Sequence, residues 1–319
     1  MDGLLSAENK PGATTAVRDG RVLPGRRDLA RALAAYRRKV WRTGPGVGVP
    51  TLGRAAAFVN EVGLCLLFGC GKIPLPKLEL CGPPDFEWWE WKDQLQERRQ
   101  AYLGRVVRRK AALISMPLLP AFLGLYYAGG GVEVYDEEHH HGRLSDDAWR
   151  LGEYLSGHGP TPVDRLRRAL MVAGPAGTRR FHKALDEMQE KFKSVTVGRV
   201  RKHWSVRIIG LVSDWAPADL LREAHLLARH PQQARERILE RAVRTAGALG
   251  IREAAAMFGW TGAETQAAAA TLVKRGALRS LPPGAPRATS AGRRGRAGRR
   301  RPPAGGSAAG ATLVAAGLW

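Results

Sequence analysis

Cysteine is scarce in this chain of 319 residues, and its three copies lie close together at Cys65, Cys70 and Cys81. They include no CxxC pair and lack a fourth ligand at zinc spacing, so they predict neither a disulfide framework nor a zinc site. We interpret them as reduced thiols of a cytoplasmic protein. The first residues also lack a basic stretch followed by an apolar run, the pattern expected of a secretory signal.

Motifs for nucleotide and metal chemistry are missing as well. The chain has no GxxxxGK[ST] phosphate loop and no HExxH, GxSxG or DxDxDG sequence, which argues against chemistry on nucleoside triphosphates. Three consecutive histidines, His139–His141, follow three acidic residues in a Gly-flanked segment. Adjacent side chains point in different directions, so we expect a solvated loop there, and we predict neither a metal nor a cofactor.

Acidic residues are too few to balance the basic ones. The chain has 51 Lys and Arg against 29 Asp and Glu, a net charge of +22. Such a charge attracts polyanions, so nucleic acid is the first candidate partner and an anionic membrane the second. Residues 281–319 contain seven Arg and no acid, but a clear excess remains on the part that should fold. We therefore expect double-stranded DNA as the partner, at the nucleoid.

One charge-free stretch approaches the length of a membrane span. It covers 18 residues, Ala111–Ala128, and follows a basic segment. Pro117 and Pro120 interrupt any helix there, and the length is at the lower limit for crossing a bilayer. The sequence therefore predicts a buried segment broken by proline and no membrane partner.

The chain contains the same succession of three predicted helices twice, at residues 145–199 and 232–280. In the first copy the third helix places a single apolar stripe toward the core, and a Val- and Thr-rich segment follows. In the second copy, Thr261 with Glu264 three residues later predicts a capping box. This order is typical of the winged helix-turn-helix. The expected fold is mainly α with short β wings, arranged as tandem winged helix-turn-helix modules.

Composition and turn signals divide the chain into segments. The predicted segments are a flexible N-terminal tail (1–25), an N-terminal helical module for which a divergent winged helix is an alternative (26–128), a loop (129–142), a central winged helix (143–203), a C-terminal winged-helix module (204–280) and a disordered basic tail (281–319).

Winged-helix proteins contact DNA through the N-terminal residues of their third helix. In the central module these residues are basic, and in the C-terminal module they are polar with cations in the last turn. The predicted DNA contacts are therefore, in first rank, Arg179, Arg180 and Lys183, and, in second rank, Thr265, Gln266, Lys274 and Arg275.

The segment FEWWEWKD, residues 86–93, has the most unusual local composition. Its three tryptophans cannot share one face of a helix or strand, so at least one should line a surface or cleft. An enzyme acting on an extruded base needs an aromatic platform, a phosphate-binding cation and a carboxylate. Trp89 or Trp91, Lys92 and Asp93 supply these groups, with Asp93 as the candidate catalytic residue that positions water. The alternative is a tryptophan-rich packing corner.

These features together resemble the AlkZ-type (YcaQ-like) winged-helix family, whose described members are DNA glycosylases that release alkylated bases and unhook interstrand crosslinks. Residues 145–192 resemble its central winged helix and residues 204–260 its C-terminal module. FVNEVGLCLLF and WWEWKD are closer to the uncharacterised AlkZ-related branch. The resemblance implies tandem winged helices that form a basic cradle for DNA. Gln94-Leu-Gln96 has the letters of the family's catalytic Gln-x-Gln in a different context, so that role is not transferred.

The sequence leaves three functions open. The first is a glycosylase-like protein of alkylated or crosslinked DNA repair; if it is an enzyme, it is a metal-independent N-glycosidic bond hydrolase. The second is a winged-helix transcription regulator or nucleoid-binding protein without catalysis. A peripheral membrane protein that uses residues 105–128 is a third, minor alternative.

Overall fold

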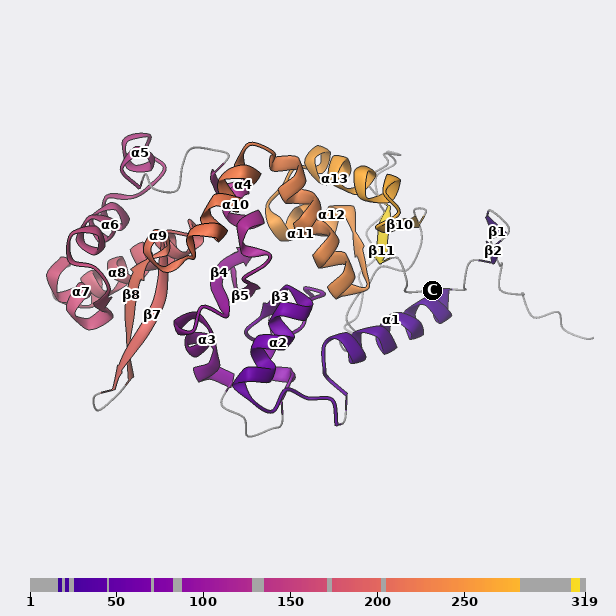
Figure 1. Cartoon of the computed structure of the whole chain (residues 1–319), viewed down its shortest axis with the longest axis horizontal. Coiled ribbons are helices and arrows are strands. Elements are labelled where there is room, and N and C mark those ends of the chain that lie inside the picture. The colour runs from indigo at the N-terminus through magenta and orange to yellow at the C-terminus, as the bar shows by residue number, and fades with distance from the viewer. Residues whose placement is uncertain are drawn as a thin grey trace, which may run out of the picture.

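The computed structural model describes residues 17–18, 21–22, 26–44, 46–69, 72–82, 88–127, 135–170, 174–201, 205–281 and 311–315. Within these ranges the chain forms thirteen α-helices and three antiparallel sheets of three strands each, together with a small two-stranded sheet (Figure 1). The molecule is therefore mostly helical with short strands, as the sequence predicts.

Three segments of the chain share one order of elements: a helix, a short strand, two further helices and a pair of strands. The first unit contains α2 (Leu52–Val62), β3 (Leu64–Leu66), the 3₁₀ helix η1 (Leu78–Leu80), α3 (Trp88–Glu97), β4 (Ala101–Val107) and β5 (Lys110–Ser115). The second unit contains α6 (Asp146–His158), β6 (Thr161–Pro162), α7 (Val163–Leu170), α8 (Pro175–Glu190), β7 (Ser194–Arg201) and β8 (Ser205–Leu211). The third unit contains α11 (Pro231–Ala246), β9 (Ala248–Gly250), α12 (Ile251–Phe258), α13 (Gly262–Lys274), β10 (Leu278–Leu281) and β11 (Thr312–Ala315).

The sheets repeat this likeness. In every unit the last strand lies between the other two, giving the orders β3-β5-β4, β6-β8-β7 and β10-β11-β9. In Figure 1 the second unit is at the left, the first in the centre and the third at the right.

The remaining helices join the units. They are α1 (Arg26–Val40), α4 (Leu119–Tyr127), α5 (Tyr135–His140), α9 (Val212–Trp215) and α10 (Ala218–Ala228), and the small sheet pairs β1 (Val17–Arg18) with β2 (Arg21–Val22). One continuous core includes side chains of all three units with those of α4 and α10. Helices α4 and α10 approach closely at Gly124, where an added Cβ would lie 2.7 Å from the Cβ of Leu227. This shared core fixes the units relative to one another.

Helix α1 caps the C-terminal end of α11, where the last carbonyl groups have no partner within their own helix. The Tyr36 hydroxyl donates to the Arg244 carbonyl at 2.6 Å, the Arg37 Nε to that of Ala246 at 2.8 Å and the Trp41 Nε1 to that of Thr245 at 2.7 Å. These three bonds attach the N-terminal helix to the third unit.

The first unit differs from the helical module that the sequence predicts. Helix α2 ends at Val62, because Gly63 adopts a left-handed φ of 76° and the chain continues as β3. Helix α3 ends at Glu97, and β4 starts at Ala101. The module expected to be helical thus contains a three-stranded sheet.

The charge-free stretch Ala111–Ala128 divides into most of β5 and all of α4, on either side of Pro117. Among the described residues, no helix is both long and apolar enough to cross a membrane. The prediction of a buried segment interrupted by proline is therefore confirmed.

Two segments expected to lack structure have some. Within the predicted loop, Tyr135–His140 form α5, because Glu138 is buried and accepts from the Tyr126 hydroxyl at 2.8 Å. Within the predicted C-terminal tail, Thr312–Ala315 form β11, the middle strand of a sheet, with Leu313 and Val314 buried. Both predictions are wrong at these residues; the Arg-rich residues 282–310 lie outside the described ranges.

Candidate functional site

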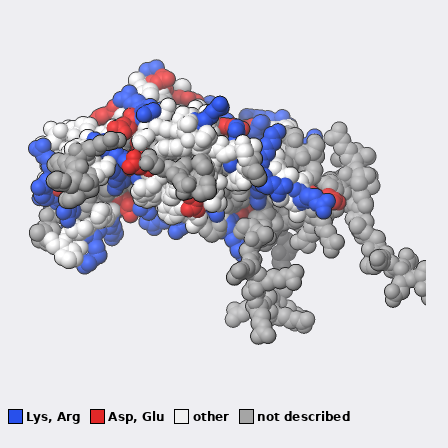
Figure 2. Space-filling view, turned by 90° about the horizontal axis from the view of Figure 1, so that it is seen from below, with Lys and Arg blue, Asp and Glu red and all other residues white. Residues whose placement is uncertain are grey.

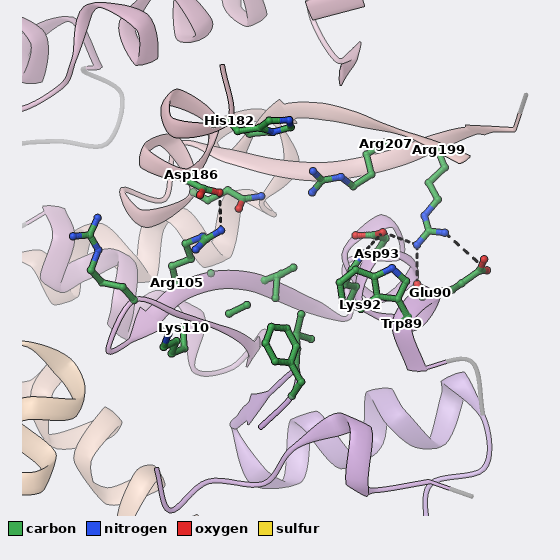
Figure 3. A pocket seen from close by; sticks show the side chains of 18 of the residues that line it. Trp89, Glu90, Lys92, Asp93, Arg105, Lys110, His182, Asp186, Arg199 and Arg207 are labelled. Atoms are coloured by element: carbon green, nitrogen blue, oxygen red, sulfur yellow. Dashed lines mark hydrogen bonds and ion pairs between the residues drawn. The ribbon is translucent and has the colours of Figure 1, made fainter. Parts of the chain in front are cut away.

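A pocket of about 610 Å³ lies where the first and second units meet. We call it the junction pocket. Its walls come from α3, the β4–β5 hairpin, α8 and the β7–β8 hairpin, so segments distant in the sequence line one space (Figure 3). The residues that give it chemical character are Trp89, Lys92, Asp93, Lys110, His182, Arg199 and Arg207.

Asp93 has an unusual position at this pocket. The residue is 3% exposed, and its Oδ2 accepts from the Lys92 Nζ at 2.6 Å and from the Arg199 Nη2 at 2.6 Å. Its Oδ1 is buried and has no hydrogen-bond partner among the described residues. A buried acceptor without a donor is costly, so Oδ1 is suited to receive a hydrogen bond from a ligand or water in the pocket. Burial lowers the pKa of Lys92, and the ion pair with Asp93 opposes that shift.

The three tryptophans of α3 face different ways, as their spacing predicts. Trp91 is 8% exposed and packs in a core cluster with α2, whereas Trp89 is 55% exposed and lines the junction pocket. The Lys92 Nζ lies 4.5 Å from the centre of the Trp89 ring, a cation–π contact. Of the two tryptophans predicted as a stacking platform, only Trp89 presents its ring to the pocket.

Gln96 does not reach the pocket. Its side chain is fully buried, where Oε1 accepts from the Leu103 backbone at 3.3 Å and Nε2 donates to the Lys92 carbonyl at 3.2 Å. The bond from Leu103 connects α3 to β4, and the bond to Lys92 lies within α3. The Gln94-Leu-Gln96 sequence therefore has a structural use at its second glutamine, and its match to the family's catalytic letters gains no support here.

A second hollow, of about 750 Å³, follows the outer face of α8. We call it the α8 hollow. Arg179 and Lys183, two of the predicted DNA contacts, line it. The residues that it shares with the junction pocket are Arg105, Arg109, His182 and Asp186. The two hollows are thus adjacent and form one depression, which Arg179 and Lys183 border together with Trp89 and Asp93.

Carboxylates of the protein neutralise some cations of this depression. Arg105 pairs with Asp186 at 2.7 Å, and Arg109 binds Glu190 through two hydrogen bonds of 3.2 and 2.9 Å. Arg180, a predicted DNA contact, is held in the same two-bond manner by Asp147, at 2.9 and 2.6 Å. This pairing leaves Arg180 a poorer candidate than its neighbours.

Other cations of the depression make no ion pair within the described part of the chain. They are Lys110, Arg179, Lys183 and Arg207. A basic side chain without a carboxylate partner is available to a phosphate group. Viewed from below, the lobe of the second unit carries basic side chains along its edge, with acidic ones mixed in toward the centre (Figure 2). Among the described residues, the depression therefore contains both paired cations and four cations that are available to phosphate groups.

The predicted contacts of α13 do not join this depression. Thr265 is fully buried and its hydroxyl donates to the Thr261 carbonyl at 2.9 Å, so it cannot contact DNA. Arg275 pairs with Glu236 at 3.0 Å. Gln266 and Lys274 are exposed, but neither lines the junction pocket or the α8 hollow. The second-rank contacts therefore reduce to these two side chains.

Lys110, Arg199 and Arg207 also line the junction pocket, although they are not among the predicted site residues. Arg199 and Arg207 are directly opposite each other on the β7–β8 hairpin. Two like charges in that position repel each other, and an anion between them would relieve the repulsion. A pair of arginines at matching positions of a predicted hairpin is the signal that would have identified them.

The described residues contain no group of His, Cys, Asp or Glu side chains arranged to hold a metal ion. His139, from the histidine run, stacks on the Trp149 ring at 4.7 Å and contacts Asp146 at 2.8 Å. Its role in the structure is a surface contact between α5 and α6.

The chain is similar to a known protein family. The family model described as "AlkZ related" matches residues 49–257, which span the first two units and end at the second helix of the third. No curated protein and no solved structure matches this chain.

Proposed function

The chain belongs to the AlkZ-related family, and on that premise we propose that it binds double-stranded DNA and receives an extruded nucleotide in the junction pocket. The reaction that suits this pocket is hydrolysis of an N-glycosidic bond in alkylated or crosslinked DNA. The observation that carries the proposal is the buried, unpartnered Oδ1 of Asp93, a residue that lines the same pocket as Trp89 and whose Oδ2 binds Lys92 and Arg199.

We take the three repeated units as winged helices. Their common order of elements and their common strand order, with the last strand in the middle, support this assignment. In such modules the third helix approaches the DNA groove and the strand pair forms the wing. Here α3 and α8 are third helices and β7–β8 is a wing, and all three border the junction pocket.

The pocket has the size and the groups for a nucleotide. Its volume of about 610 Å³ is in the range usual for small-ligand sites, roughly 300–1,000 Å³. Stacking on Trp89 would return ~1–3 kcal/mol per base, comparable with the few kcal/mol that extrusion costs. Lys110 and Arg207 can bind the flanking phosphates, and Arg179 and Lys183 can bind the duplex along α8.

Asp93 has two possible contributions to hydrolysis. When the bond between C1′ and the base nitrogen breaks, its electron pair leaves with the base and the sugar gains positive charge, as in other glycosyl transfers. A carboxylate beside the sugar stabilises that charge. The attacking water forms the new bond to C1′, and Oδ1 can accept the proton that this water loses.

The test pairs two variants that each break the ion pair between Asp93 and Arg199. Asp93→Asn removes the carboxylate, and Arg199→Gln removes a cation that binds it. Each is incubated with duplexes that carry N-alkylated bases, and abasic sites are counted after alkaline cleavage. We expect Asp93→Asn to reduce excision about 100-fold or more with duplex affinity retained, and Arg199→Gln to keep most excision. Excision by Asp93→Asn at the rate of the wild type would refute the catalytic role.

A second function is favoured by a different feature of the same residue. Oδ2 of Asp93 binds two cations at once, an arrangement that also suits a purely structural ion-pair network. On this alternative the protein is a transcription regulator or nucleoid-associated binder. Tight, salt-dependent duplex binding with no abasic product on any lesion would establish it in place of the enzyme.

A further inference from the structure

A third concave surface lies on the other side of the β4–β5 hairpin. It encloses about 400 Å³ between the tip of this hairpin, α4, the end of α8 and the turn from α12 to α13. We call it the aromatic pocket. The family resemblance and the proposed reaction assign nothing to it.

Aromatic rings form one wall of this pocket. Phe258 ends α12, and Gly259 then takes a left-handed φ of 74° that turns the chain toward Trp260. The Phe258 and Trp260 rings lie 4.8 Å apart at an angle of 31°, and Phe258 also contacts Phe122 of α4 at 6.2 Å. Both side chains are only partly buried. The wall therefore offers flat apolar surface to a ligand.

Arginine forms the opposite rim. Arg108 and Arg109 occupy the hairpin turn with φ of 48° and 58°, and the Arg108 backbone donates to the Met257 carbonyl at 2.9 Å. Two consecutive left-handed residues are the positions where hairpins prefer Asn-Gly, so arginine strains the backbone there. Arg109 is held by Glu190, whereas Arg108 makes no ion pair within the described part of the chain. The turn thus keeps a cation beside the aromatic wall despite its conformational cost.

We propose that the aromatic pocket binds a second, unpaired nucleotide of the same DNA. Its base stacks on the Phe258 and Trp260 wall, and its phosphate pairs with Arg108. Aromatic surface next to a cation is the combination with which proteins hold single-stranded nucleic acid. The path is continuous, because Arg105 and Arg109 line the aromatic pocket as well as the junction pocket and the α8 hollow. This inference rests on the proposed DNA binding but not on catalysis.

The experiment compares two DNA probes, an intact duplex and the same duplex with a short single-stranded gap. Trp260→Leu keeps an apolar side chain but removes the flat ring, and Arg108→Gln removes the cation. Trp149→Leu is the matched control, because Trp149 lines none of the three hollows. Circular dichroism and thermal melting show that each variant folds.

We expect the wild type to bind the gapped probe more tightly than the intact duplex. Trp260→Leu should weaken binding to the gapped probe about tenfold and change binding to the intact duplex little. Trp149→Leu should change neither affinity. Arg108→Gln should weaken binding to the gapped probe more than binding to the intact duplex. Equal affinity of the wild type for both probes, or a Trp260→Leu variant that binds both as the wild type does, would overturn the inference and leave duplex binding standing. Failure of the wild type to bind either probe would overturn the proposed function as well.

Discussion

Arg199 and Arg207 are cross-strand partners on the β7–β8 hairpin, but only Arg199 is neutralised, at 2.6 Å from the Oδ2 of Asp93. Arg207 faces the same pocket without a carboxylate partner in the described part of the chain. The hairpin thus presents one arginine that is paired with Asp93 and one that remains available. An incoming phosphate would complete the pattern, because it would reduce the repulsion between the two guanidinium groups.

This relationship predicts the behaviour of Arg207→Gln. The substitution should weaken duplex binding uniformly across sequences and reduce the slope of log affinity against log salt by about one, the loss of one phosphate contact. Stability should stay the same or rise, because a like charge opposite Arg199 is removed. Binding titrations between about 50 and 200 mM salt measure the slope.

Arg229→Gln is the control for that measurement. Arg229 is exposed in the turn that follows α10, and it lines none of the three hollows. Both variants lower the net charge by one, so a general electrostatic effect would change their slopes equally. An identical slope for the two variants would show that Arg207 makes no specific phosphate contact.

The second and third units could be predicted from the sequence because their signals are local. The three helices of the second unit, and the turn from α12 to α13 in the third, follow from apolar periodicity and capping residues, and Thr261 with Glu264 forms the predicted capping box. For the first unit the sequence predicts a divergent winged helix only as an alternative, because its middle helix is only the three-residue η1. Its strands also pair across long separations, as in Leu64 with Ile114. Pairing over such distances leaves no periodic signal in either segment.

The site residues also divide into those with a local sequence signal and those without one. Trp89, Arg179 and Lys183 could be proposed from local composition, and they do border one depression. The burial of Asp93 depends on packing between the first and second units, where Arg199 binds it. The engagement of Arg180 by Asp147 and the burial of Thr265 depend on packing between helices of a single unit. Composition gives no information on which cations find a carboxylate partner, so it overstates the number of available ones.

The capping box predicts an acid-sensitive contribution to stability. The backbone and hydroxyl of Thr261 donate to Glu264, and these bonds lower the pKa of its carboxyl below 4.5. Between the folded-state and unfolded-state pKa values, the unfolded state therefore binds more protons than the folded state. The stabilisation is complete above pH 4.5 and is lost as the pH falls through the lowered folded-state pKa.

Thr261→Ala should remove about 1 kcal/mol at neutral pH and also remove this part of the acid dependence. Urea unfolding of both proteins between about pH 7 and about pH 3 tests the sign. A difference in stability between the two proteins that does not shrink on acidification would contradict the assigned role of Glu264.

Alanine substitutions at two glycines distinguish the stability cost of a left-handed backbone from the stability cost of a steric clash. Gly46 and Gly63 have similar φ values of 73° and 76°, but an added Cβ meets nothing within 4 Å at Gly46 and lies 2.3 Å from the Arg241 Cγ at Gly63. Gly46→Ala should cost about 1 kcal/mol, the left-handed penalty alone.

Gly63→Ala should cost clearly more, about 2–4 kcal/mol. The methyl group displaces Arg241, whose guanidinium donates to the Glu61 carbonyl at 2.7 Å and so links the first and third units. Chemical denaturation of the two variants measures the difference. Equal costs would mean that Arg241 moves aside freely and contributes little to this link.

Strand β11 is the middle strand of the third sheet, although its residues were predicted to belong to a disordered tail. It pairs with β10 on one side and β9 on the other, and its Leu313, Val314 and Ala315 are 1%, 0% and 4% exposed. Truncation after Leu281 removes the middle strand of the third sheet. Burial of a Leu or Val side chain contributes roughly 1.5–3 kcal/mol, so the third unit should lose several kcal/mol and expose part of the shared core.

A deletion within residues 282–310 that keeps β11 gives the matched comparison. Leu281 and Thr312 are register partners, so a short Gly-Ser connection can replace the intervening residues and preserve the sheet. Both variants lose the seven arginines of this region, and they should lose the same electrostatic part of DNA affinity. Only the truncation should lower the melting temperature. If the two variants melt together, residues 312–315 do not contribute the strand that completes the third unit.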